Sequence, residues 1–272
     1  MPELAEVEYI RRQWDAGLRQ KIVAVSLHAE KRLFRGVDLD LLQKKFVGAT
    51  YLDSEARAKQ MLFRFSKGLW LGVHLGMTGH LRVEPPDFAP GKHDHLALHQ
   101  KKQTLVFQDP RLFGRVRVEE SEEMPAWWTE LPPAIGSSEW SEERLATFLR
   151  RRARLAVKAA LLVQTAFPGV GNWMADEILW RAGIDPRRLC GQLSAAQIST
   201  IWRETRDVCR IALETVAVDY SDPPADWLFH QRWSKEGCCP KHQIPLETAT
   251  VGGRTTRWCK RCQPSGGVRG KR

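Results

Sequence analysis

The sequence has no apolar run long enough to form a membrane-spanning helix. Such a helix needs about 20 apolar residues, whereas the apolar segment Leu155–Val163 is much shorter and carries Lys158. A secretory signal is also missing, because the chain starts with the acidic residues Glu3 and Glu6 where a signal peptide is basic and then apolar. We therefore expect a cytoplasmic protein that does not bind membranes.

Cysteine is absent before Cys190, and most of the cysteines lie near the C-terminus. Disulfides are rare in a reducing compartment, and the spacing Cys239-x2-His242-x16-Cys259-x2-Cys262 is typical of a zinc ribbon. Three thiolates and one imidazole complete a zinc tetrahedron, so the sequence predicts one structural zinc ion. Cys238 could replace Cys239 as a ligand, and the spacing leaves that choice open.

Acidic residues are outnumbered by basic ones, 32 against 42, which gives a formal net charge of +10. This excess favours a polyanionic partner, with nucleic acid as the first candidate, although many basic proteins bind no polyanion. Apolar residues make up 43% of the chain, which is typical of a globular protein. The 11 tryptophans are scattered, which is typical of core residues rather than of a base-stacking surface.

The hydrophobic pattern predicts an α+β fold in which strands come first and helices follow. A short N-terminal helix precedes β-rich runs separated by turn residues, typical of an antiparallel sandwich. Later segments have helical spacing, with Ser141 and Ser194 as N-caps and Gly183 as a stop. The expected parts are a β-sandwich domain (1–120), an acidic, proline-rich linker (121–140), a helical domain (141–225), the zinc ribbon (226–264) and a basic tail (265–272).

Pro2 directly follows Met1, a context in which we expect removal of the initiator methionine. The secondary amine left behind would be partly neutral and nucleophilic near pH 7, because α-amino groups have a reference pKa of about 7.7–8.0. Its attack on an aldehyde-like carbon would give an iminium ion, and Glu3 and Glu6 lie on one helix face beside it. Taken alone, these residues equally fit an ordinary helix start with proline and acids in the first turn.

Two glycine-containing turns could contact nucleic acid, one at a phosphate and the other, a basic hairpin tip, in a groove. Gly169–Asn172 joins two predicted helices, where free N–H groups at a helix start bind phosphates. Gly252-Gly253 predicts a hairpin turn in the ribbon with Arg254 at its tip. A ligand-free helix turn and a solvated hairpin are the alternatives.

Taken together, five sequence blocks resemble the formamidopyrimidine-DNA glycosylase / endonuclease VIII family of base-excision repair enzymes. The resemblance extends from residue 1 to about residue 263, and the Pro-Glu-Leu start favours the formamidopyrimidine branch. The blocks are Met1–Glu8, Lys59 after a basic stretch, His74–Gly79, Asp109–Gly114, and Gly169–Asn172 followed by the zinc ribbon ending at Gln263.

The resemblance implies a bifunctional DNA glycosylase and AP lyase, with a helix–two-turn–helix in the helical domain. Its substrate would be double-stranded DNA with damaged bases or abasic sites, bound by a monomer in the bacterial cytoplasm and nucleoid. The implied catalytic residues are Pro2 as nucleophile, Glu3 as general acid and base, Glu6 in support, Lys59 for β-elimination and Arg254 for δ-elimination. The implied DNA-binding residues are His74, His93 and Asn172 at phosphates, and Met77, Arg111 and Phe113 in the gap left by the flipped nucleotide.

Simpler interpretations exist for single residues, and the chain departs from the family pattern at several places. Alone, Met77 or Phe113 would be a core residue, Arg111 a surface ion-pair partner and Lys59 a solvated charge; the pair His93 and His95 fits strand alternation better than a metal site. The departures are Ala5 for proline, Leu112 for a second arginine, Met174 for tyrosine, and Cys-x2-His in the first ligand pair.

The segment 219–237, where the family carries a loop that covers the flipped base, is short and tryptophan-rich. We therefore expect poor excision of 8-oxoguanine, while the preferred lesion and the base opposite it stay open. Two other functions compete with the glycosylase: an AP lyase with little base excision, and a damaged-DNA-binding protein without turnover. The presence of Pro2, Glu3 and Lys59 together argues against the binding protein.

Overall fold

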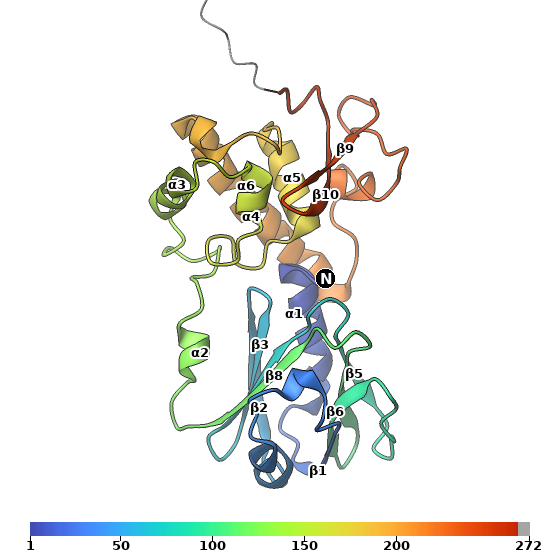
Figure 1. Ribbon diagram of the computed structural model, residues 1–272. Coiled ribbons are helices and arrows are strands. Elements are labelled where there is room, and N and C mark those ends of the chain that lie inside the picture. The colour runs from blue at the N-terminus through green and yellow to red at the C-terminus, as the bar shows by residue number, and fades with distance from the viewer. Residues whose placement is uncertain (266–272) are drawn as a thin grey trace, which may run out of the picture. The chain divides into compact units, whose positions relative to one another are not determined.

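The computed structural model describes residues 1–265, and the chain divides into two units, Met1–Leu131 and Pro132–Arg272. Except for Ser265, the predicted basic tail 265–272 lies outside the described residues. Each unit has its own core, and Figure 1 shows strands in the first and mainly helices in the second. Within residues 1–265, no helix is both long enough and apolar enough to cross a bilayer.

The first unit contains two four-stranded antiparallel sheets, as the sequence predicts for a sandwich. One sheet has the order β1 (Ile22–Leu27), β6 (Asp94–Gln100), β7 (Thr104–Gln108) and β5 (His80–Glu84). The other has the order β2 (Tyr51–Arg57), β3 (Gln60–Phe65), β4 (Leu69–His74) and β8 (Arg115–Glu120). The hydrophobic pattern does not reveal strand β2, because it is an edge strand whose exposed positions carry charges such as Asp53 and Glu55.

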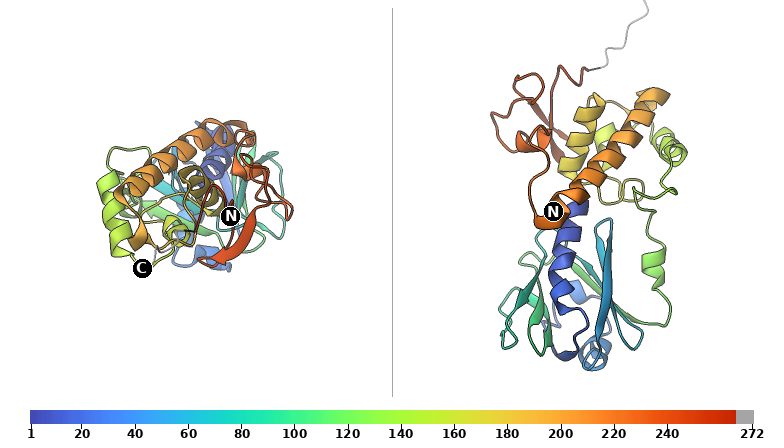
Figure 2. Two further views of the ribbon diagram at one scale, coloured as in Figure 1. Left: turned by 90° about the horizontal axis from the view of Figure 1, so that it is seen from above. Right: turned by 180° about the vertical axis from the view of Figure 1, so that it is seen from behind.

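The core of the first unit lies between the two sheets and under α1 (Leu4–Arg12). Phe63 of β3 and Phe107 of β7 are fully buried in it, together with Trp14, whose indole N–H donates to the Arg82 carbonyl. Helix α1 contacts β2 and β3 of one sheet and β5 of the other (Figure 2). This packing holds the first residues of the chain against the sandwich.

Short helical elements complete both units. They are the helical turns Gln13–Gly17, Arg32–Phe34 and Leu41–Lys45, the helix α2 (Ala126–Thr129), and, in the second unit, the turns Cys190–Gln192 and Leu228–His230.

The second unit is built on α5 (Asn172–Ala182) and α6 (Ala195–Glu214), which contact each other. The Ser194 hydroxyl accepts from the Gln197 N–H at the start of α6, and Gly183 ends α5 with φ +68°, as predicted. The remaining helices are α3 (Glu142–Arg151), which Ser141 caps as predicted, α4 (Val157–Leu161) and α7 (Val216–Asp219). Helix α4 ends before the turn at Gln164, whose amide donates to the Leu162 and Val170 carbonyls.

A two-stranded hairpin follows the helices, formed by β9 (Glu247–Val251) and β10 (Arg254–Trp258). Its turn is Gly252-Gly253, as predicted, and both glycines have positive φ, +59° and +72°. A Cβ at Gly252 would lie 2.7 Å from the Ala159 Cβ, so glycine is also required for the hairpin to pack on α4.

Candidate active site and metal centre

Glu3 occupies the N-cap position of α1 and is 3% exposed. Its backbone N–H donates to the Glu6 carboxylate, with 2.6 Å between N and Oε2. This hydrogen bond fixes the backbone next to Pro2, while Met1 is 45% exposed. Glu6 therefore has two roles. It caps the start of α1, and it positions Glu3, the residue that follows the candidate nucleophile Pro2.

Lys59 lies in the two-residue turn Ala58–Lys59 between β2 and β3, and only 6% of it is exposed. The interpretation of Lys59 as a solvated charge is therefore wrong. The neighbouring strand pairs Gln60 with His74, and burial together with the positive charge of Lys59 lowers the pKa of His74. The His74 Nδ1 accepts from the Gly76 N–H at 3.0 Å, so a neutral ring carries its proton on Nε2. A buried cation beside a neutral N–H donor suits an anionic phosphate oxygen.

Two turns carry the residues expected to enter a gap in DNA, the Met77 turn (residues 75–79) and the Phe113 turn (residues 109–114). The structure brings them into contact, because a Cβ on Gly76 would lie 2.3 Å from the Phe113 carbonyl carbon. Met77 is half-buried and Phe113 is 46% exposed, so Phe113 is not a core residue. The guanidinium groups of Arg111 and Arg32 each lie 4.9 Å from the Phe113 ring centroid.

Arg32 belongs to this group, although the sequence did not single it out. Its side chain donates to the backbone carbonyls of Leu112 and Arg111 and so holds the Phe113 turn from outside. Leu112, which stands where the family carries a second arginine, has φ +58°. Arg32 lies 79 residues before Arg111, and no local pattern in the sequence indicates such a contact.

His93 lies beside the Phe113 turn and is half-buried, with its carbonyl accepting from the Asp109 N–H at 3.0 Å. Its neighbours have partners within the sandwich. His95 is 1% exposed and its Nε2 lies 2.9 Å from the Asp109 carbonyl oxygen. The Asp94 carboxylate accepts from the Gly91 N–H and pairs with Arg82.

Asn172 is the first residue of α5 and connects that helix to the β9–β10 hairpin. Its Nδ2 donates to the Thr255 carbonyl at 2.9 Å, while its Oδ1 is buried and has no hydrogen-bond partner among residues 1–265. Its backbone carbonyl accepts from the Lys158 ammonium at 2.7 Å. Arg254 is exposed at the first position of β10. The helix start and the hairpin with Arg254 are thus joined by one side chain.

A buried group of charges supports this connection. The Asp176 carboxylate pairs with Lys158 through Oδ1 and with Arg232 through Oδ2, the latter at 2.7 Å, and all three side chains are at most 4% exposed. Its Oδ2 also accepts from the Arg257 N–H of β10 at 3.4 Å. Asp176 therefore connects α4, α5, the segment that contains Arg232, and the β9–β10 hairpin. A lysine inside an apolar helix was the only sequence signal for this site.

Glu177 next to it gives a testable pH dependence. Burial raises its pKa from 4.5 to about 8. Its Oε2 accepts from the Phe229 N–H, and its Oε1 has no hydrogen-bond partner in the part of the chain that the structure describes. Between pH 4.5 and 8 the unfolded chain has lost this proton while the folded chain keeps it, so Glu177 lowers stability progressively as the pH rises through that range. We expect Glu177→Gln to raise the melting temperature over wild type by an amount that grows from pH 5 to 8 and then levels off.

Thermal unfolding of both proteins at a series of pH values measures this difference. The matched control is Glu214→Gln, an exposed pair partner of Arg210 on α6, which should give no such pH-dependent gain. A constant difference between Glu177→Gln and wild type across pH 5–8 would contradict the prediction.

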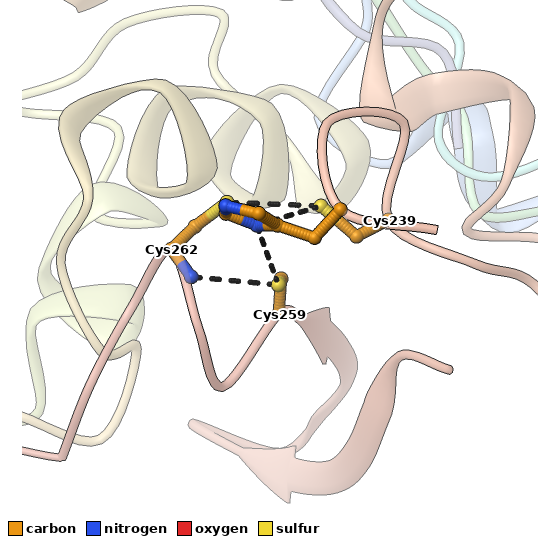
Figure 3. A group of neighbouring side chains, drawn as sticks. Cys239, Cys259 and Cys262 are labelled. Atoms are coloured by element: carbon orange, nitrogen blue, oxygen red, sulfur yellow. Dashed lines mark hydrogen bonds between the residues drawn. The ribbon is translucent and has the colours of Figure 1, made fainter. Parts of the chain in front are cut away.

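The predicted metal ligands come together in the second unit. One ligand atom from each of Cys239, His242, Cys259 and Cys262 lies within 4.8 Å of the others. The His242 Nδ1 lies 3.2–3.8 Å from the three sulfurs, and the sulfurs of Cys239 and Cys262 are 3.6 Å apart (Figure 3). Zn–S and Zn–N bonds of about 2.3 and 2.1 Å in a tetrahedron give edges of about 3.6–3.8 Å, so this donor set fits a metal of that size.

The structure also decides which of the adjacent cysteines belongs to the cluster. Cys239 is buried in it, and its sulfur accepts from the Trp180 indole N–H at 3.4 Å. The Cys238 sulfur instead lies 3.6 Å from the Glu236 carbonyl. With four protein ligands the set is closed, which is typical of a structural site.

Known proteins resemble this chain over nearly its whole length. A family model described as the formamidopyrimidine-DNA glycosylase N-terminal domain matches residues 1–116, and one described as the formamidopyrimidine-DNA glycosylase H2TH domain matches residues 133–222. Formamidopyrimidine-DNA glycosylases of Syntrophotalea carbinolica and Xanthomonas campestris are 36% and 34% identical to it, each covering 97% of this chain and 100% of the relative.

Solved structures show the same fold. The Lactococcus lactis Fpg in complex with an abasic site containing DNA has a TM-score of 0.85 at 25% identity, and a mutant of it with a Fapy-dG containing DNA has 0.84 at 26%. Each covers 97% of this chain and 100% of the solved one.

Proposed function

The chain belongs to the formamidopyrimidine-DNA glycosylase family, and from this premise we propose which of its residues carry out the chemistry. It is a DNA glycosylase of base excision repair with AP lyase activity. The observation that carries the residue assignment is the start of α1, where buried Glu3 directly follows Pro2 and is fixed by Glu6. Its substrate is double-stranded DNA with a damaged base or an abasic site.

Pro2 is the proposed nucleophile once Met1 has been removed. Its nitrogen bonds to C1′ of the damaged nucleoside, the bond from C1′ to the base breaks, and opening of the sugar ring leaves an iminium ion. The iminium accepts electrons, so the C2′ proton is lost and the 3′ phosphate leaves by β-elimination. Glu3 gives a proton to the sugar's ring oxygen as the ring opens and accepts the proton lost from C2′, and Glu6 acts through Glu3 as a positioning residue.

The other assigned residues bind the DNA backbone or complete strand cleavage. Lys59 and His74 bind a phosphate beside the lesion, and Lys59 also serves in β-elimination; their adjacent positions on β2–β3 and β4 support this pairing. His93 and Asn172 are further phosphate contacts, and exposed Arg254 serves in δ-elimination. Met77, Arg111 and Phe113 fill the gap left by the flipped nucleotide, in agreement with their clustering on two touching turns.

Cys239, His242, Cys259 and Cys262 are the proposed ligands of one structural zinc ion. When bound, the ion would cross-link the chain at the base of the β9–β10 hairpin and would take no part in the reaction. We also propose a monomer. We place its action on chromosomal DNA in the bacterial cytoplasm, since the relatives that are 34–36% identical over 97% of this chain are bacterial enzymes.

Lesion choice follows from how segment 219–237 packs. Trp227 and Leu228 are buried, Phe229 contacts Trp173 edge-on at 5.1 Å, and Glu177 holds the Phe229 N–H. With its middle packed on α5, the segment has little chain left to cover a flipped base. We therefore expect oxidised bases as substrates, with 8-oxoguanine removed more slowly than formamidopyrimidine.

A nicking assay on four duplexes tests this function, with an abasic site, formamidopyrimidine, 8-oxoguanine or an oxidised pyrimidine as the lesion. We expect cleavage at the abasic site and at formamidopyrimidine, and slow cleavage at 8-oxoguanine. Cleavage of the abasic duplex alone would favour an AP lyase with little base excision. Binding without any cleavage would favour the damaged-DNA-binding protein, and equal rates on 8-oxoguanine and formamidopyrimidine would contradict the argument from the segment.

A further inference from the structure

Asp109 is fully buried, and its carboxylate binds both of the turns that carry the gap-filling residues. Oδ1 accepts from the Thr78 hydroxyl of the Met77 turn at 2.9 Å. Oδ2 accepts from the Gly114 N–H at the end of the Phe113 turn at 2.7 Å, and Oδ1 also accepts from the Arg111 N–H at 3.3 Å. One side chain is thus shared by two turns that lie 31 residues apart in the sequence.

The two turns also touch through their backbones. Gly76 has φ +64°, and a Cβ there would lie 2.3 Å from the Phe113 carbonyl carbon and 2.5 Å from its oxygen. A Cβ on Gly114 would lie 2.7 Å from the Phe107 ring and 3.0 Å from the Asp109 carboxylate. Since backbone meets backbone, neither turn can shift far without displacing the other.

Asp109 is itself anchored to the sheet behind it. Its N–H donates to the His93 carbonyl at 3.0 Å, and its own carbonyl lies 2.9 Å from Nε2 of the buried His95. A carbonyl only accepts, so this Nε2 carries the proton, and the His95 Nδ1 faces the His28 Nδ1 at 3.3 Å. Backbone and side chain of Asp109 therefore connect β6 to both turns.

We propose that Asp109 is a positioning residue that makes the Met77 turn and the Phe113 turn one rigid wedge, with the Thr78 hydroxyl as the link between them. Asp109 is fully buried and acts through the two turns that it holds. It sets the spacing at which Met77, Arg111 and Phe113 enter the gap opposite a flipped nucleotide. The free protein is thereby preorganised to bind DNA that contains such a gap. The proposal rests on the proposed function, which assigns Met77, Arg111 and Phe113 to the gap left by the flipped nucleotide.

Thr78 offers the sharpest test, because its hydroxyl is the side-chain group of the Met77 turn that bonds to Asp109, and the residue is exposed. Thr78→Val removes the donor at nearly constant size, and Thr78→Ser keeps it. Water does not easily replace the lost bond, since Asp109 is 0% exposed. We expect Thr78→Val to lower the affinity for a duplex with an abasic-site analogue about tenfold, as for loss of a hydrogen bond to a charged group. Affinity for the intact duplex should stay unchanged, and Thr78→Ser should bind like wild type.

Two further measurements separate a positioning role from a general loss of structure. A fluorescent 2-aminopurine opposite the abasic site should report weaker insertion in Thr78→Val, while borohydride trapping on single-stranded abasic DNA, which has no gap to fill, should be unchanged. Phe113→Ala gives the loss of abasic-duplex affinity that is expected when the gap is not filled. If Thr78 and Phe113 act through one unit, adding Thr78→Val to Phe113→Ala should lower that affinity little further.

The proposal is overturned if Thr78→Val binds the abasic duplex like wild type, if it loses intact and abasic duplex equally, or if Thr78→Ser fails to restore binding. Failure of wild type to form any trapped adduct would instead refute the proposed function. The two failures are therefore distinguishable.

Discussion

A protein that keeps Met1, or carries a tag before Pro2, should form no covalent adduct with abasic DNA in the presence of borohydride. In the free protein the secondary amine of Pro2 forms an iminium with C1′, which borohydride reduces to a stable amine. A preceding residue turns this nitrogen into an amide, whose lone pair is delocalised and not nucleophilic. We expect complete loss of the adduct and of strand cleavage.

The control is the same tag placed after the C-terminal residue, which leaves the amine free and should leave trapping intact. The blocked protein should still bind abasic DNA, because Arg111, Asn172 and the basic surface are unchanged. Peptide mapping of the wild-type adduct should identify residue 2. Trapping that persists with a blocked N-terminus and maps to Lys59 would refute the assignment of the nucleophile.

Glu3→Gln separates the two roles at this helix start. The substitution leaves the amine free, so trapping at a preformed abasic site should persist. Base removal should fall about 10²- to 10⁴-fold, the range for loss of a general acid or base.

Removal of zinc should have the second large effect, loss of folded structure in the ribbon. We expect one equivalent of zinc in the purified protein and its loss in Cys259→Ser. Structural zinc sites contribute about 10–16 kcal/mol of apparent binding free energy in small zinc-finger peptides at neutral pH, and such peptides are unfolded without metal. The hairpin with Arg254 and the Thr255 carbonyl that binds Asn172 should then become open to proteolysis.

Cys238→Ser is the matched control, because the Cys238 sulfur lies outside the ligand cluster. It should keep its zinc and its resistance to limited proteolysis, whereas Cys259→Ser should lose both. Metal analysis and proteolysis of the three proteins measure this. A wild-type protein without zinc, or a Cys259→Ser variant that keeps a full equivalent, would contradict the prediction.

Much of the fold could be predicted because the signals were local. Ser141 and Ser194 cap helices, Gly183 ends one, and Gly252-Gly253 forms a hairpin turn, since each acts on backbone groups within a few residues. The antiparallel sandwich, the helical segment after it and the ligand positions His242, Cys259 and Cys262 were predicted from spacing. Family membership was also predicted, from five short blocks in a fixed order.

The tertiary structure alone decided what depends on distant contacts. The sequence could not choose between Cys238 and Cys239, because both satisfy the spacing. Only the folded chain places the Cys239 sulfur in the cluster and the Cys238 sulfur at the Glu236 carbonyl. It did not reveal that Asp176 binds Arg232, 56 residues away, or that Asp109 binds Thr78. The position of a charged or hydroxyl side chain in the sequence does not predict which distant residue it will bind. Such pairs form only when the packed core brings separate segments together.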